Sequence, residues 1–146
     1  MSNASMARSY IIQAKIRISA IERAIPEGNY AYAIRQSQEA VELCLKASLR
    51  LVAIEPPRWH DVGPILRAYR SRFPQWFQEN IDRYAYISRQ LRREREPSMY
   101  GDEELGIPPD ELYTRYDAEQ IYHYAKEILD ACLRLYRELV GEEIDP

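Results

Sequence analysis

The sequence predicts an all-α protein, an up-and-down bundle of four long helices and one short helix. Three observations predict it. Apolar residues recur at the three-and-four spacing of an amphipathic helix over long stretches, most clearly between Tyr30 and Val52. No stretch alternates apolar and polar residues as a half-buried strand does. The links between the helical stretches are mostly short, which favours antiparallel neighbours in a bundle.

The first two helices are expected over about 6–24 and about 29–53. Pro26 and Gly28 are helix breakers, so they end the first helix. The two prolines at 56–57 end the second, because proline lacks the backbone N–H and disfavours helix in the residue before it.

A short third helix is expected to begin at Asp61 and to end near Phe73. The carboxylate of Asp61 suits an N-cap, since it can accept hydrogen bonds from the free N–H groups of the first turn. The neighbouring His60 is interpreted as a histidine that packs the loop before this helix. A longer helix is expected from about Pro74 to about Arg95.

The stretch 96–116 differs in character, because it combines prolines and glycines with several acidic residues. These breakers exclude a long helix. A loop of this length is uncommon inside a compact domain and is usually functional or mobile. The last helix is expected from Asp117, as its cap, to Val140, with Gly141 as the stop.

Composition sets limits on partners. The chain has 146 residues, which suits one domain around one core. Residues 1–5 are interpreted as the remnant of an expression tag, and residues 6–146 as a single helical domain. The formal net charge is −3, so only a local basic patch would attract nucleic acid. Twelve tyrosines against two phenylalanines suit half-buried rings or the association surface of a dimer.

The two cysteines, Cys44 and Cys132, lie on apolar helical stripes. No CxxC pair or Cys/His cluster occurs, so neither a zinc site nor another cofactor is expected. Lone thiols suit a reducing compartment, here the cytoplasm. No apolar run is long enough to span a bilayer, and no signal-type leader is present, so no membrane association is expected.

One basic cluster stands out, and we interpret it as a candidate nucleotide- or RNA-binding site. Its members are Arg89, Arg92, Arg93 and Arg95, with Tyr100 following. Arginines on one helical face can bind phosphates, and a nearby tyrosine ring can stack on a base. The alternative is a solvated helix end, where cations suit the negative end of the helix dipole.

Four stretches, in this order and spacing, resemble the HEPN family of small helical proteins. They are Tyr30 to Lys46, Glu55 to Val62, Ser88 to Asp102, and Tyr116 to Ala118 leading into Ala125. The resemblance covers about Tyr10 to about Leu139. It implies an up-and-down bundle that forms a homodimer and belongs to nucleotide or RNA biology. Many members are encoded beside a small nucleotidyltransferase partner, as a toxin–antitoxin pair.

The resemblance also implies a possible active site. Active members are metal-independent ribonucleases with an arginine and a histidine separated by four to six residues near the start of the last helix. The nearest match is Arg115 with His123, separated by seven residues, and Arg115 is expected just before the helix. Arg115 would steady a phosphate, and His123 would act as general acid or base. His123 lies about 200° around the helix from Ile121, so a solvent-facing histidine is the alternative.

The sequence therefore supports three functions. The first is a HEPN-type interaction module that acts with a nucleotidyltransferase or another nucleic-acid-processing partner. The second is a metal-independent endoribonuclease, a toxin, that uses Arg115 and His123. The third is a non-catalytic nucleotide-binding bundle that uses the arginine cluster and Tyr100.

Overall fold

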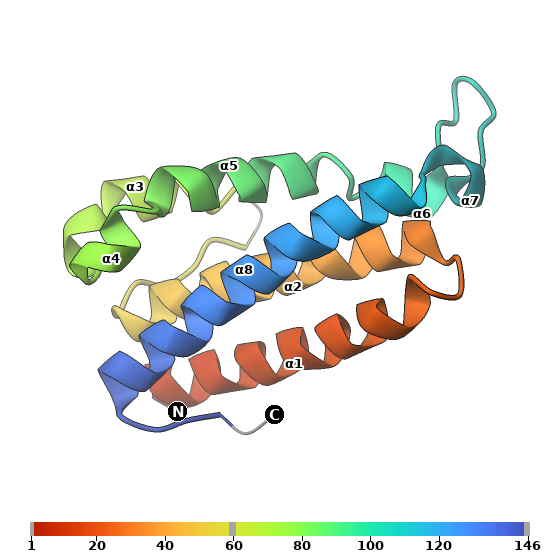
Figure 1. Ribbon diagram of the computed structural model, residues 1–146. Coiled ribbons are helices and arrows are strands. Elements are labelled where there is room, and N and C mark those ends of the chain that lie inside the picture. Colours follow the sequence, from red (N-terminus) through yellow and green to blue (C-terminus); the bar gives the residue numbers. More distant parts are fainter. Residues whose placement is uncertain (1, 59–60, 145–146) are drawn as a thin grey trace.

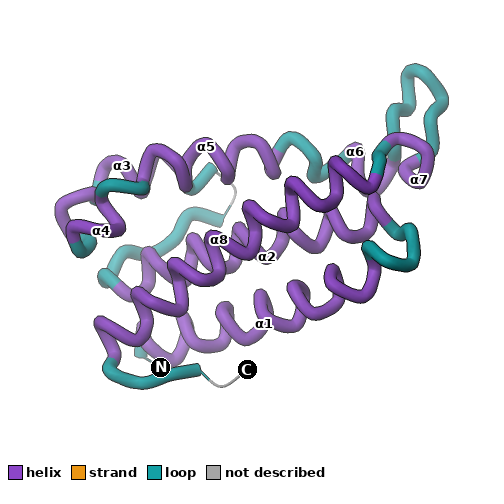
Figure 2. Tube along the Cα trace, in the orientation of Figure 1, coloured by secondary structure: helices purple, strands orange, loops and turns teal. Residues whose placement is uncertain are grey.

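The computed structural model describes residues 2–58 and 61–144, and every element in these ranges longer than an isolated bridge is a helix (Figures 1 and 2). The long helices are α1 (Asn3–Ala24), α2 (Tyr30–Leu51), α5 (Ile81–Arg92) and α8 (Arg115–Val140). Helices α1, α2 and α8 lie side by side, and successive long helices run in opposite directions (Figure 1). The all-α, up-and-down prediction is confirmed.

The core lies between the long helices, where each contributes the apolar stripe that its spacing predicted. Helix α2 buries more residues than any other helix in the described ranges, because it packs against α1, α8 and α5. Burying such stripes drives helix association, at about 25 cal/mol per Å² of apolar surface. The largest fully buried side chains are Ile11, Ile21, Ile34, Leu45, Leu49, Leu66, Phe77, Ile81, Ile87, Leu91, Ile128 and Leu135.

Helix α1 begins earlier than the sequence predicted. Ser2 is its N-cap, and the Ser2 side chain accepts a hydrogen bond from the backbone N–H of Ser5 at 3.1 Å. Ser2 and Ser5 are both exposed, so this first turn adds little to the core. The tag interpretation of residues 1–5 stays a prediction.

The predicted helix over 74–95 is wrong, because two helices occupy it: α4 (Gln75–Gln78) and α5. Two side chains donate hydrogen bonds to main-chain oxygens that would accept backbone N–H groups in a continuous helix. Asn80 Nδ2 donates to the main-chain oxygen of Trp76 at 2.7 Å, and Arg70 Nη1 donates to that of Gln78 at 2.7 Å. The chain therefore turns at Asn80.

The short predicted helix before it is also shorter than expected. Helix α3 runs over Gly63–Ala68, followed by the 3₁₀ turn η1 (Arg70–Arg72). Val62, not Asp61, occupies the N-cap position. The Asp61 carboxylate still accepts the N–H of Gly63 at 3.1 Å, and it also accepts the hydroxyl of Ser88. His60 lies outside the described residues.

The segment 96–116 is ordered into short elements and is not one long loop. Helix α6 (Pro97–Tyr100) is followed by a hairpin closed by a bridge between Asp102 and Ile107, and then by α7 (Pro109–Leu112). In Figure 1 the hairpin projects from the end of the bundle where α6 and α7 lie. In place of the single short helix that was predicted, the described residues contain the four short helices α3, α4, α6 and α7.

Helix α8 begins at Arg115, two residues before the predicted cap. Thr114 is the N-cap, and its side chain accepts from the N–H of Asp117 at 3.2 Å. Asp117 in turn accepts the N–H of Thr114 at 2.8 Å, which completes a capping box. The prediction that Arg115 precedes the helix is therefore wrong. Gly141 ends the helix with φ 84°, as expected.

The two cysteines meet inside the bundle. Cys44 on α2 and Cys132 on α8 are both buried, and Cys132 Sγ donates to the main-chain oxygen of Cys44 at 3.3 Å. They act as small core residues. No helix in the described ranges has the length and hydropathy required to cross a bilayer.

Candidate functional site: an arginine groove and the start of the last helix

An open groove of about 680 Å³ lies where the end of α5 and α6 meet α2. We call it the arginine groove. Its lining residues are Arg35, Arg92, Arg93, Arg95, Glu96, Pro97, Met99 and Tyr100. The structure thus brings together three of the four predicted arginines and Tyr100. It adds Arg35, which sequence reasoning missed as a site residue because it lies on another helix.

Arg35 joins the two walls of the groove. Its Nη1 donates a hydrogen bond to the main-chain oxygen of Arg95, and its Nε donates to Glu39 Oε2 at 2.9 Å. Glu39 also accepts from Arg17 Nε on α1 at 3.0 Å. Arg35 is therefore oriented by fixed partners, and its charge is already shared with a carboxylate.

The other three arginines differ in their burial and in their ion-pair partners. Arg92 is half-buried, with Nη1 at 4.0 Å from Glu42 Oε1. Arg93 and Arg95 are exposed, and neither side chain makes a hydrogen bond or ion pair with another described residue. Because charges without partners keep their full attraction for an anion, these two are the groove's available cations.

Apolar groups border these cations. The Tyr100 ring is 60% exposed, and the neighbouring Met99 is 47% exposed. An exposed ring beside guanidinium groups is the arrangement that binds single-stranded nucleic acid, where phosphates meet the cations and a base stacks on the ring.

Arg89 does not line the groove. Its guanidinium lies over the Tyr86 ring, 5.9 Å from the centroid, one helical turn before Arg92 and Arg93. Of the predicted binding residues, Arg89 is thus the one that the fold separates from the others.

Arg115 and His123 lie on the first turns of α8, and both are exposed. Eight positions separate them, which is about 12 Å along the helix axis and about 80° around it. Arg115 Nε is 2.7 Å from Glu119 Oε1, and this hydrogen bond raises the pKa of Arg115. Glu119 lies four residues from each of them, so it occupies the surface between the two. Neither side chain lines the arginine groove.

Two tyrosines flank His123, as half-buried residues of α8. Burial raises the pKa of Tyr122 to about 12, together with a hydrogen bond that its hydroxyl donates to Glu22 on α1. The Tyr122 ring lies 5.5 Å from the His123 ring, and Tyr124 packs edge-on against Tyr86 at 6.5 Å. Both tyrosines are held by contacts within the bundle.

The model of the HEPN domain family matches residues 7–136. The chain belongs to the HEPN family. The match includes the arginine groove, Arg115 and His123, so both candidate sites lie inside the HEPN domain. No match was found among curated proteins or among solved structures.

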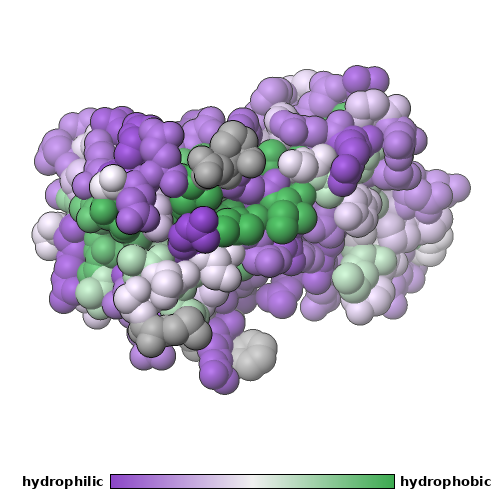
Figure 3. All heavy atoms as spheres, turned by 90° about the horizontal axis from the view of Figure 1, so that it is seen from below, coloured by the Kyte–Doolittle hydropathy of each residue, from purple (hydrophilic) through white to green (hydrophobic). Residues whose placement is uncertain are grey.

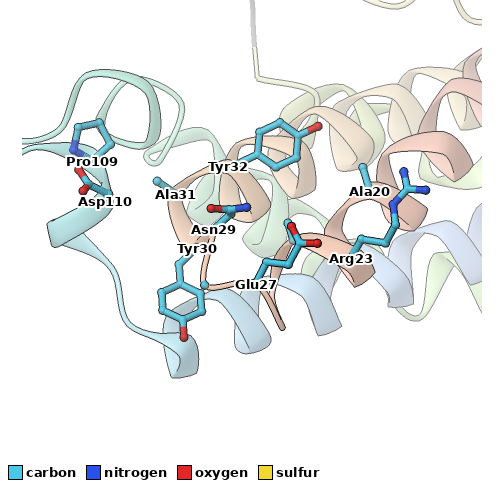
Figure 4. Close-up of a pocket in the computed structure, with 11 residues that line it drawn as sticks. Ala20, Arg23, Glu27, Asn29, Tyr30, Ala31, Tyr32, Pro109 and Asp110 are labelled. Carbon is cyan, nitrogen blue, oxygen red and sulfur yellow. The ribbon is translucent and has the colours of Figure 1, made fainter.

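This HEPN domain has other hollows. One of about 620 Å³ lies at the α1–α2 turn, beside α7. Figure 4 shows Arg23 at one end of it and Asp110 at the other, with Glu27 between them. One guanidinium group and two carboxylates thus face the same space, so the hollow offers no cluster of cations for a phosphate. A smaller groove of about 330 Å³ between α1 and α8 has a lining of four apolar and four polar side chains. It includes Ile16, which is 57% exposed, and Figure 3 shows apolar side chains on the face that carries α1.

An acidic hollow of about 560 Å³ lies between the hairpin, α7 and the start of α8. Its carboxylates belong to Glu94, Asp102, Glu103, Glu104 and Asp117. Among residues 2–58 and 61–144, no group of three or more histidine, cysteine or acidic side chains is placed to hold a metal ion. The hollow is therefore acidic in character.

Proposed function

We propose that this HEPN domain binds single-stranded RNA in the arginine groove, as a non-catalytic module that acts with a nucleic-acid-processing partner. The observation that carries the proposal is the presence of two unpaired arginines, Arg93 and Arg95, in one open groove with the exposed ring of Tyr100. The chain as a whole is acidic, so the attraction for phosphate is local to this groove.

The chemistry of the groove favours an anionic ligand. Its lining has four guanidinium groups and one carboxylate, that of Glu96. Each phosphate neutralised by an arginine releases condensed counterions from the RNA, which supplies affinity without sequence preference. Stacking of a base on Tyr100 adds about 1–3 kcal/mol.

The test is fluorescence anisotropy with a labelled single-stranded RNA. Arg93→Gln/Arg95→Gln removes the two free cations, and we expect affinity to fall about tenfold or more at low salt. Arg8→Gln/Arg23→Gln on α1 is the matched control, because it removes the same charge from exposed positions outside the groove. Equal losses in the two variants would show that binding follows net charge and not the groove.

The same experiment has a nucleotide arm. A thermal-shift series with ATP and other mononucleotides separates an RNA site from a nucleotide site, because a ligand that binds the native state raises stability by mass action. A shift with mononucleotides that Arg93→Gln/Arg95→Gln abolishes would assign the groove to nucleotides.

Membership in the family supports a nucleotidyltransferase as the partner. The expected partner is one encoded beside this chain, and the two purified proteins should then form a complex in size-exclusion chromatography. Separate elution at micromolar concentration would remove the nucleotidyltransferase from the proposal while leaving RNA binding in place.

A metal-independent ribonuclease is the second candidate, favoured by the position of Arg115 on the first turn of α8. There it shares an exposed helical surface with His123, about 12 Å away along the helix axis. Arg115 would have to release Glu119 and extend toward His123 for both side chains to contact one phosphodiester. The test is cleavage of structured RNA in EDTA by the wild type, Arg115→Ala and His123→Ala. Cleavage that both variants retain would eliminate this site.

A further inference from the structure

The arginine groove and the acidic hollow meet at α6, where Pro97 lines both of them. One depression is lined by four arginines and a single carboxylate, and the other by five carboxylates without an arginine or lysine among its lining residues. Two concave surfaces of opposite charge therefore share one wall at the same end of the bundle.

The hairpin that borders the acidic hollow is held in one conformation. Asp102 and Ile107 exchange both backbone hydrogen bonds, at 2.9 and 3.0 Å, and Asp102 Oδ1 accepts the N–H of Leu105 at 3.1 Å. At its base, Gly101 has φ 75° and packs so closely that a Cβ would lie 2.1 Å from the Ile107 oxygen. The hairpin is therefore pre-organised, which lowers the entropy lost on binding.

Both depressions carry charged side chains without partners. Within the described ranges, Glu103 and Glu104 on the hairpin make no side-chain hydrogen bond or ion pair, as is true of Arg93 and Arg95 in the groove. By contrast, Glu94 accepts the Tyr113 hydroxyl at 2.9 Å. Glu96, the one carboxylate of the groove, also makes no side-chain hydrogen bond or ion pair with a described residue. The hairpin thus offers two free carboxylates, and the groove offers two free guanidinium groups against one free carboxylate.

The hairpin does not neutralise its own groove, because none of its acidic residues lines it. A second copy offers the complementary arrangement. In a two-fold dimer, each patch meets the same patch of the partner, so the interface must be self-complementary. A patch that carries a basic groove and an acidic hairpin, joined at α6, is self-complementary in charge.

We propose that the acidic hairpin of one copy docks into the arginine groove of a second copy, and reciprocally, so that two molecules exchange hairpins across a two-fold axis near α6. Leu105 at the hairpin tip is 73% exposed, and Met99 and Tyr100 in the groove are largely exposed. In the dimer, Leu105 of one copy would pack against Met99 and Tyr100 of the other, between the charge pairs. Charge complementarity sets the pairing and makes it salt-dependent.

Two charge-reversal variants test the exchange by sedimentation velocity at low salt. Glu103→Lys/Glu104→Lys places lysines opposite the partner's arginines, and Arg93→Glu/Arg95→Glu places glutamates opposite the partner's carboxylates. Each variant alone is expected to lose self-association by a factor of about 10 or more, because like charges then face each other at both contacts. Both changes are at exposed positions, and circular dichroism confirms folding.

The decisive step is to mix the two variants. In the mixed dimer, the lysine hairpin meets the glutamate groove and the native hairpin meets the native arginine groove, so both contacts are attractive. Association is expected to return. Glu55→Lys/Glu79→Lys, at exposed positions outside the two depressions, carries the same charge change as the hairpin variant and should leave the dimer intact.

Three results would overturn the proposal: a wild-type monomer at all accessible concentrations in low salt, a dimer that survives both reversals, or mixed variants that fail to associate. The exchange stands apart from the proposed RNA binding, because it is measured without RNA. One consequence rests on both: RNA and the partner's hairpin compete for one groove, so RNA should shift the wild type toward monomer. If RNA binds and no dimer ever forms, only the exchange fails.

Discussion

Arg35 on α2 donates a hydrogen bond from Nη1 to the main-chain oxygen of Arg95, which follows the end of α5. This contact joins segments 60 positions apart and forms one corner of the arginine groove. Arg35 is also held by Glu39, so it positions the groove and shares its own charge. The two roles predict that its loss affects both stability and binding.

Replacing Arg35 should lower both the stability of the protein and its affinity for RNA. Arg35→Ala removes hydrogen bonds to Glu39 and to the Arg95 oxygen at a half-buried position, and we expect the free energy of unfolding to fall by about 1–3 kcal/mol. Urea unfolding measures the loss. Arg35→Lys keeps the charge without the planar fork, so it should recover little of this stability. A full recovery by lysine would show that charge alone matters here.

Gly101 should be indispensable to the hairpin. Gly101→Ala combines an unfavourable positive φ with a Cβ placed 2.1 Å from the Ile107 oxygen, which forces the backbone apart. Amide hydrogen exchange at Asp102 and Ile107 should then become rapid. Gly106→Ala is the matched control, since it also has a positive φ of 67° but its Cβ would meet no atom within 4 Å. Equal protection of these two amides from exchange in both variants would show that the close contact at Gly101 does not hold the hairpin.

Alkaline pH should weaken the bundle through Tyr122. Its pKa in the folded protein is about 12, above the ordinary value of 10.0, because burial and the hydrogen bond to Glu22 favour the protonated phenol. A raised folded pKa gives stability that is complete below pH 10 and is lost as the pH rises toward 12. Tyr122→Phe should lessen this loss in unfolding experiments between these values. Identical pH dependence in both proteins would exclude the assignment.

The salt dependence of RNA binding should report the number of groove contacts. For single strands, the slope of log affinity against log salt is about −0.7 per phosphate neutralised, so Arg93→Gln/Arg95→Gln should reduce its magnitude by about 1.4. Anisotropy titrations over a range of salt concentrations give both slopes. A variant that loses affinity without a change in slope would place these arginines outside the phosphate contacts.

The sequence predicted the fold because the helical stripes are local patterns. The stripes of α1, α2 and α8 appear at the expected positions, since each depends only on spacing within one segment. The break at Asn80 could not be predicted in this way. It depends on Arg70, whose side chain reaches the carbonyl of Gln78 only once the chain has folded.

The candidate site was partly predictable for the same reason. Arg92, Arg93 and Arg95 are neighbours in sequence and stay neighbours in the groove. Arg35 joins them through tertiary packing, which no local pattern reveals. The start of α8 could have been predicted from the sequence. Thr114 with Asp117 three residues later is a capping-box spacing, and it places Arg115 on the helix.

RNA binding in the arginine groove is tested most directly by an NMR titration of the arginine Nε–H signals with a single-stranded RNA of about six nucleotides. We expect the signals of Arg93 and Arg95 to shift first and most, together with the ring signals of Tyr100. Arg8 and Arg23 on α1 should not respond. Shifts confined to Arg115, or spread evenly over all exposed arginines, would contradict the assignment of RNA binding to the arginine groove.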